Sequence, residues 1–203
     1  MVQIYLKDYM KLLNLFFLCG QSKMNSIEIE DSVRKFRPLR DIFKGVYARD
    51  TIPYYLTTGN YSKFGLIVNF DKHNNVGSHW VAIFVPRGKP FMEYFDSFGR
   101  RPTYSTIKSF LKQRKFYIYN NIKLQSVLNT TCGQYCLFYL ICRALDISPK
   151  RIISFFSKDN FQFNDYLVNE TINSLFKANH KVTDIDFLLQ QIKEITDQYG
   201  ANS

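Results

Sequence analysis

The run from His79 to Asp96, HWVAIFVPRGKPFMEYFD, decides the fold of this chain. Its first seven residues, 79–85, are almost continuously apolar, which is typical of a strand buried on both faces. Pro and Gly punctuate residues 86–90, and residues 91–95 form a second short segment rich in aromatic side chains. Two such segments joined by a turn predict a β-hairpin.

The two ends of this hairpin carry side chains with acid–base chemistry. His79 lies where a polar loop enters the first strand, and Asp96 lies just past the end of the second. Counted from Gly88 in the turn, His79 is nine residues back and Asp96 is eight residues forward. Antiparallel pairing therefore places them nearly opposite each other, and we expect a hydrogen bond between imidazole and carboxylate.

The elements around the hairpin predict an α+β domain. Its sheet is expected to be mixed and mostly antiparallel, with one buried helix against it. Residues 157–182 allow no assignment. Helices are predicted at 26–36 with Ser26 as N-cap, 103–114, 132–144, 148–156 and 183–198, and further strands at 64–70, 115–119 and 122–127, with a loop and short strand in 45–58.

The buried helix begins at a cysteine. Cys132 follows the capping-type residues Asn129, Thr130 and Thr131, and the helix continues as YCLFYLICRAL. Because a helix N-terminus carries partial positive charge, it favours the thiolate, which is the nucleophilic form of cysteine. Gly133 leaves room for a substrate carbonyl beside the backbone. Oxyanion donors would be the backbone N–H of Cys132 and the side-chain amide of Gln125.

Each of these residues also has a structural interpretation. A histidine beside a tryptophan at a strand start is often part of a core, an Asp-Ser-x-Gly segment is a common turn, and a cysteine near a helix start is often buried packing. Their order along the chain, with His79 and Asp96 before Gln125 and Cys132, favours catalysis over coincidence. It predicts a nucleophile activated by a base that a carboxylate orients.

The stretches GSHWVAIFV, EYFDSFG and LQSVLNTTCGQYCLFYL resemble the adenovirus endopeptidase (adenain) family over roughly residues 40–145. Related sequences include proteases of Polinton/Maverick-type elements and, more distantly, the SUMO-specific Ulp proteases. The resemblance implies a papain-like architecture. It assigns His79 as base, Asp96 as acidic partner, Cys132 as nucleophile and Gln125 as oxyanion donor, with Asn129 as a competitor for that last role.

The same resemblance places Trp80 at the aromatic position after the base, where it would pack beside the imidazole and contact substrate with Gly133. Asp followed by Ser at 96–97 is a feature of Ulp-like relatives. Residues 105–124 contain no cysteine, so an activating peptide linked by a disulfide is not expected. We expect no cofactor. Cys132 and Cys136 are four residues apart, but no His or carboxylate is spaced to complete a metal site with them.

Composition sets limits on organisation and partners. The 203 residues fit a peptidase domain at 39–203 after a helical extension at 1–38, in which 1–23 precede a possible start at Met24. The apolar run at 12–18 is too short to span a membrane.

A net charge of +10 permits non-specific DNA binding. Four cysteines, three of them close together, suit a reducing compartment. We expect an intracellular monomer, in a virion or in the host nucleus or cytoplasm by the resemblance.

Three functions are compatible with these features. The first is a cysteine endopeptidase that cleaves polypeptides at small, Gly-containing sites and matures virion or capsid-like precursors, as the resemblance implies. The second is an Ulp-type isopeptidase that removes a ubiquitin-like modifier. The third is an inactive nucleic-acid-binding module, which the basic charge suggests and the intact His79, Asp96 and Cys132 oppose.

Overall fold

The computed structural model describes residues 23–57, 63–177 and 184–200 of the chain. The expectations for residues 1–22 lie outside this part. The helices are α2 (Ser26–Lys35), α3 (Arg37–Ile42), α4 (Ser105–Leu111), α5 (Cys132–Ala144), α6 (Pro149–Ile153), α7 (Phe161–Lys177) and α8 (Ile185–Gly200). The strands are β1 (Phe43–Ala48), β2 (Phe64–Asn69), β3 (Trp80–Val85), β4 (Phe91–Phe95) and β5 (Phe116–Tyr119), and a 3-10 turn covers Tyr54–Thr57.

The five strands form one mixed sheet in the order β1-β2-β3-β4-β5. The predicted hairpin is present: β3 and β4 are antiparallel, with Ala82 opposite Phe95 and Phe84 opposite Glu93. β2 and β3 are also antiparallel, whereas β1 with β2 and β4 with β5 are parallel. The α+β class and the mixed sheet are thus confirmed. Antiparallel pairing holds in the centre, and parallel pairs occupy both edges. At the β4–β5 edge, α4 carries the chain back before β5.

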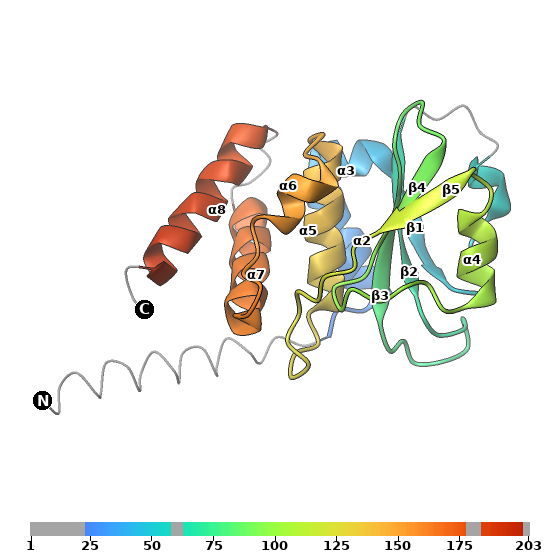
Figure 1. Ribbon diagram of the computed structural model, residues 1–203, viewed down its shortest axis with the longest axis horizontal. Helices are drawn as coiled ribbons and strands as arrows, with labels where there is room; N and C mark the ends of the chain where they lie inside the picture. Colours follow the sequence, from blue (N-terminus) through green and yellow to red (C-terminus); the bar gives the residue numbers. More distant parts are fainter. Residues whose placement is uncertain (1–22, 58–62, 178–183, 201–203) are drawn as a thin grey trace, which may run out of the picture.

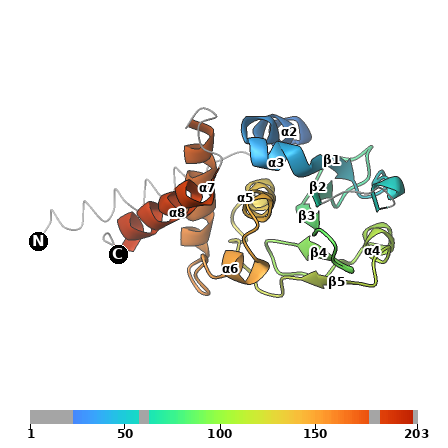
Figure 2. The same cartoon turned by 90° about the horizontal axis from the view of Figure 1, so that it is seen from above.

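Helices cover both faces of this sheet (Figure 1). On one face lies α5, with α2 and α3 beside it, while α7 and α8 form a further layer behind α5 (Figure 2). On the other face α4 packs through Ile107, Phe110 and Leu111. Both faces of β2 and β3 are therefore buried, which explains their continuous apolar sequence. Among the described residues, no helix is long and apolar enough to cross a membrane.

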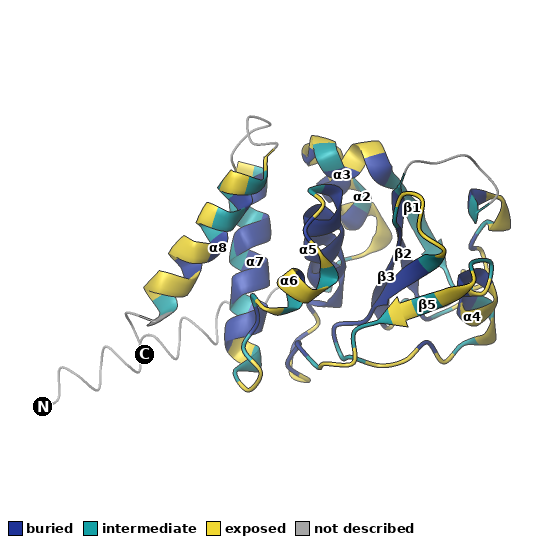
Figure 3. Cartoon of the chain, turned by 45° about the horizontal axis from the view of Figure 1, so that its top comes forward, coloured by how far each residue is buried: buried dark blue, intermediate teal, exposed yellow. Residues whose placement is uncertain are grey.

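The helix α5 is the centre of the larger core. All of its residues from Cys132 to Ala144 are buried (Figure 3). An ion pair joins it to the sheet: Arg143 donates from Nε and Nη2 to the carboxylate of Glu93 in β4, at 2.8 and 3.0 Å. The Tyr139 hydroxyl donates to the same carboxylate at 2.7 Å. These bonds fix α5, and hence its first residue, relative to the hairpin.

Two local predictions differ from the structure, and a region that the sequence left unassigned is helical. Asn25, not Ser26, caps α2. Its side chain accepts from the backbone N–H of Glu28 at 3.0 Å, and the Glu28 carboxylate accepts from the backbone N–H of Asn25. Residues 122–127 form no strand, since the backbone N–H groups of Leu124 and Gln125 donate to the single carbonyl of Ser97. The unassigned region contains the 17-residue helix α7.

The N-terminal segment shares the core of the remaining chain. Ile29, Val33 and Phe36 lie in the same buried cluster as α5. The predicted division between residues 38 and 39 falls inside α3 (Arg37–Ile42), so the described chain runs through this point as a continuous helix.

Candidate active site

The His79 side chain is held at the entrance to β3 among aromatic rings. Only 7% of the residue is exposed. The Phe70 ring meets the imidazole edge-on at 4.9 Å between centroids, and the Phe98 ring lies at 5.2 Å. Continuing the β3–β4 register from Ala82 and Phe95 puts Phe98 opposite His79. This places Asp96 two residues away from direct opposition, yet the expected bond to His79 still forms.

Asp96 begins the turn after β4 and is fully buried. Its Oδ1 accepts from His79 Nε2 at 2.8 Å and from the Phe98 backbone N–H at 2.9 Å. The Asn120 side-chain amide bonds both the N–H and the C=O of Asp96, at 2.9 and 2.7 Å. Asn120 therefore fixes the backbone of Asp96, and the Phe98 N–H in the turn fixes its carboxylate. Its Oδ2 is buried and has no hydrogen-bond partner.

A glycine lets this turn approach the loop that leads to α5. Gly99 has a φ of +68°, and an added Cβ would come within 2.6 Å of the Ile122 carbonyl carbon. Only a residue without a side chain fits there. The turn and the loop that begins at Ile122 therefore lie in direct contact.

Two opposing effects set the pKa of His79. Burial lowers it, because the charged ring loses water. Hydrogen bonds to Asp96 and to the Cys132 thiol, together with the negative charge of both groups, outweigh burial and raise the pKa from 6.5 to about 9. Both predicted partners therefore act on the pKa of the imidazole. Since Nε2 faces Asp96, the remaining nitrogen Nδ1 is the one available to the thiol.

Cys132 is the first residue of α5, as predicted, and is a free, buried thiol. Its position exposes it to the partial positive charge of the helix N-terminus. Cys136 and Cys142 lie deeper in the helix, and burial raises the pKa of both thiols. They pack in the core as expected. The described residues include no group of three or more His, Cys, Asp or Glu side chains that could hold a metal ion.

Gln125 is buried beside the Asp96 turn and is held at both ends of its amide. Its Oε1 accepts from the Ser97 hydroxyl at 2.6 Å, and its Nε2 donates to the Asn129 carbonyl at 2.7 Å. The amide nitrogen has two hydrogens, so one donor remains for an oxyanion. The Asn129 amide nitrogen instead donates to Asp165. Each amide nitrogen therefore keeps one hydrogen, so Gln125 and Asn129 both stay candidates for the oxyanion donor.

Trp80 and Gly133 lie close together at the start of α5, next to Met24. An added Cβ at Gly133 would lie 3.1 Å from Met24 Cβ and 3.5 Å from Trp80 Cδ1. The indole N–H of Trp80 donates to the Met24 carbonyl at 2.9 Å. The rings that contact His79 are those of Phe70 and Phe98. Trp80 faces the α5 core, since neighbouring strand residues point to opposite faces.

Met24 and Asp165 are the residues near this site that sequence reasoning missed. Met24 precedes a helix 108 residues before Cys132, so no local pattern links them. Asp165 lies in α7, within the region left unassigned, and is 2% exposed. The available signal was a carboxylate directly before the apolar run at 166–168, because a buried carboxylate has to be hydrogen-bonded.

Comparison with known proteins finds viral cysteine proteases among the relatives of this chain. Two isolates of African swine fever virus carry relatives, named SUMO-1 cysteine protease S273R and Cysteine protease S273R, that are 35% identical to this chain over 117 residues. The chain is homologous to these viral cysteine proteases. The match covers 51% of the chain and 43% of each relative. The chain thus spans less than half the length of the curated relatives it matches. No family model matches the chain.

Solved structures show weaker likeness. The African swine fever virus pS273R protease aligns with a TM-score of 0.44 and 22% identity, over 62% of this chain and 60% of that one. The SUMO protease Ulp1 aligns at 0.42 and 13%, over 80% and 83%. AvrA, in a structure with IP6 and CoA, aligns at 0.44 and 12%, over 97% and 79%.

Proposed function

We propose that this chain is a cysteine-type peptidase with Cys132 as nucleophile, His79 as base and Asp96 as the residue that orients the base. One observation carries the proposal: a buried imidazole is bonded through Nε2 to Asp96 at 2.8 Å, and Asp96 and the Cys132 thiol at the start of α5 together raise its pKa. Homology to viral proteins named cysteine proteases supports it.

In the proposed reaction, the Cys132 thiolate attacks the carbonyl carbon of the scissile peptide bond. The negative charge moves to the carbonyl oxygen, where the Cys132 backbone N–H and the free N–H of Gln125 stabilise it. His79 donates its proton to the leaving amine as the C–N bond breaks, which leaves an acyl-enzyme thioester. His79 then takes a proton from water as the water oxygen attacks the thioester. The C–S bond breaks, the carboxylic acid leaves, and the thiolate–imidazolium pair is restored.

A groove beside the site is suited to a polypeptide. Its volume is about 480 Å³, and its lining includes Met24, Val46, Asn69, Gly77 and Trp80. Gly77 lies two residues before His79 and Trp80 directly after it, so the segment that carries the base also lines the groove. We propose that substrate residues on one side of the scissile bond occupy it. Small, Gly-containing cleavage sites in virion precursors are the expectation to test first.

An Ulp-type isopeptidase is the second candidate. Two observations favour it: a relative bears the name SUMO-1 cysteine protease, and Ser97 follows Asp96 and holds Gln125. The chemistry at Cys132 would be the same for an isopeptide bond. Modifier conjugates with a C-terminal Gly-Gly and precursor peptides with internal Gly distinguish the two substrates.

The remaining expectations concern surroundings and partners. A catalytic thiol requires a reducing compartment, which agrees with three free cysteines among the described residues. The net charge of +10 supports non-specific DNA binding, and a monomer stays the expected form. An inactive nucleic-acid-binding module would keep the fold but show no reactivity specific to Cys132.

Iodoacetamide labelling tests the proposal, with peptide mass spectrometry to read each cysteine between pH 4 and 9. We expect Cys132 to label much faster than Cys136 at pH 6, and His79→Ala to remove this advantage. A second assay measures hydrolysis of Gly-containing precursor peptides and of Gly-Gly modifier conjugates, with Cys132→Ala as control. Equal labelling of both cysteines, with no hydrolysis that depends on Cys132, would refute the proposal and favour the inactive module.

A further inference from the structure

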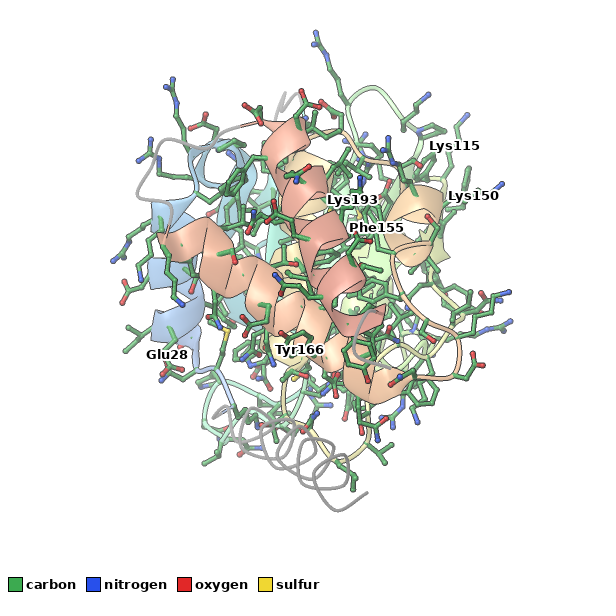
Figure 4. All side chains as sticks on the ribbon, turned by 90° about the vertical axis from the view of Figure 1, so that its left-hand side faces the viewer. Glu28, Lys115, Lys150, Phe155, Tyr166 and Lys193 are labelled. Carbon is green, nitrogen blue, oxygen red and sulfur yellow. The ribbon has the colours of Figure 1, made fainter. Side chains whose placement is uncertain are left out.

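Asp165 is a buried carboxylate near the site that accepts four hydrogen bonds. It lies on α7, which packs against α5 (Figure 1). Figure 4 looks onto the α7 and α8 side of the molecule and labels Tyr166, the next residue along α7. Its Oδ2 accepts from the Asn129 side-chain amide. Its Oδ1 accepts from the Tyr135 hydroxyl at 3.0 Å, and from the Ser126 backbone N–H and the Thr131 hydroxyl at 3.4 Å. All four donors come from the loop that precedes Cys132 or from the first turn of α5.

This loop has little apolar packing of its own. Val127 and Leu128 at its tip are 69% and 82% exposed, whereas Ser126 and Asn129 on either side are buried. The loop is therefore held at its polar ends rather than by burial of its apolar tip. Among the bonds at those ends, the ones to Asp165 attach the loop to another helix.

The contacts continue from Asp165 to the oxyanion donor. Asp165 binds the side chain of Asn129, and the carbonyl of Asn129 accepts from Gln125 Nε2 at 2.7 Å. On its other side, Gln125 accepts from Ser97, the neighbour of Asp96. Asp165 also bonds Thr131, the residue directly before the nucleophile. The carboxylate thus supports both groups that would bind the oxyanion.

We propose that Asp165 is a positioning residue that holds the amide of Gln125 and the backbone N–H of Cys132 in place to bind the oxyanion. The inference rests on the proposed peptidase function and adds to it a residue outside the nucleophile, base and acid. A carboxylate suits this role because it only accepts hydrogen bonds, and four donors converge on it. Asn in its place adds a donor, and Ala removes every acceptor.

The first test is kinetic and uses whichever Gly-containing peptide or Gly-Gly conjugate the wild type hydrolyses through Cys132. Loss of one oxyanion donor lowers kcat by about 100-fold to 1000-fold, so we expect Gln125→Ala to fall in this range. Asp165→Ala should lower kcat at least about tenfold, with KM within about twofold, because the effect belongs to the transition state. Asp165→Asn should retain more activity than Asp165→Ala.

A double-mutant cycle separates positioning from general destabilisation. If Asp165 acts through the oxyanion site, Asp165→Asn added to Gln125→Ala should cost much less than Asp165→Asn alone. Iodoacetamide labelling of Cys132 needs no oxyanion stabilisation, so it should stay close to wild type in Asp165→Asn. Glu170→Gln on the same helix is the matched control and should leave kcat unchanged. Circular dichroism confirms that each variant is folded.

The pH profile gives an independent readout. Burial raises the pKa of Asp165 from 3.8 to about 6, against the lowering effect of its four hydrogen bonds. The titratable side chain bonded to it is Tyr135, whose own pKa is raised, so it stays protonated over this range. Protonation of Asp165 replaces an acceptor by a donor. We expect kcat to fall as pH drops through about 6 in the wild type and not in Asp165→Asn.

The outcomes separate the two proposals. A wild type with no hydrolysis through Cys132 refutes the peptidase and the positioning role together. An active wild type with an unchanged kcat in Asp165→Asn and Asp165→Ala, or with additive effects of Asp165→Asn and Gln125→Ala, refutes the role of Asp165 alone. Reduced kcat with strong coupling to Gln125 and loss of the inflection near pH 6 supports it.

Discussion

His79 shows how two opposing effects act on one side chain. Phe70 and Phe98 exclude water from the ring, which disfavours its charge. Asp96 and Cys132 favour the charge and together raise the pKa to about 9. The imidazolium form therefore persists at neutral pH, where it can stabilise a neighbouring thiolate and hold a proton for the leaving amine.

This balance predicts the alkaline limit of activity. Below about pH 9 His79 carries the proton that the leaving amine needs, so kcat/KM should fall as pH rises through about 9. Asp96→Asn removes a negative charge next to the ring, and we expect the fall to move to lower pH. Measurement of kcat/KM between pH 6 and 10 for both proteins tests this. An identical alkaline limb in the two would show that Asp96 does not set the pKa of His79.

At the scale of elements, the sequence predicted the helices and strands whose pattern of apolar residues reflects burial alone. The strands β2, β3 and β4 and the whole of α5 follow from continuous apolar runs. Residues 122–125 alternate apolar and polar side chains like a strand, but the backbone N–H groups of Leu124 and Gln125 donate to the Ser97 carbonyl. The helix α7 was missed because Asn164, Asp165, Asn169 and Thr171 lie on its buried side and interrupt the apolar stripe.

The same limit applies to the site. His79, Asp96 and Cys132 could be proposed from the sequence because they lie at element ends, where the hairpin and the helix start bring chemistry together. Gln125 lies in the loop between β5 and α5, and its place upstream of Cys132 suggested it. The support from Asp165 and the packing of Met24 on Gly133 depend on tertiary contacts between segments distant in sequence. No local spacing encodes such contacts.

The start of α2 gives a test at this scale. Asn25 and Glu28 form a reciprocal capping box, while Ser26 is exposed in the first turn. Asn25→Ala should lower the free energy of unfolding by about 1 kcal/mol, as loss of an N-cap does. Ser26→Ala is the matched control and should change it little. Urea unfolding of both variants measures the difference. A larger cost for Ser26→Ala would instead support the cap expected from the sequence.

For the whole molecule, the position of α5 on the sheet decides whether the site exists at all. His79 and Asp96 belong to the hairpin and Cys132 to α5, so their geometry depends on the contact between these two layers. The bond of Glu93 to Arg143 and Tyr139 crosses that contact, and the Arg143 guanidinium also lies 4.5 Å from the Phe84 ring centroid. Burial raises the pKa of Glu93 despite the ion pair.

Because both charges are buried, removal of one should cost more than removal of both. Glu93→Leu removes the carboxylate that neutralises the Arg143 guanidinium, which keeps its bond to the Ile147 carbonyl, and leaves the Tyr139 hydroxyl without its acceptor. We expect a loss of about 3 to 5 kcal/mol in the free energy of unfolding. Glu93→Leu combined with Arg143→Met replaces the pair by apolar side chains and should be more stable than Glu93→Leu alone. Urea unfolding of the wild type, both single variants and the double variant gives the coupling energy. If the two single losses simply add, the pair contributes no coupling between sheet and helix, and apolar packing of α5 alone sets the distance from Cys132 to His79.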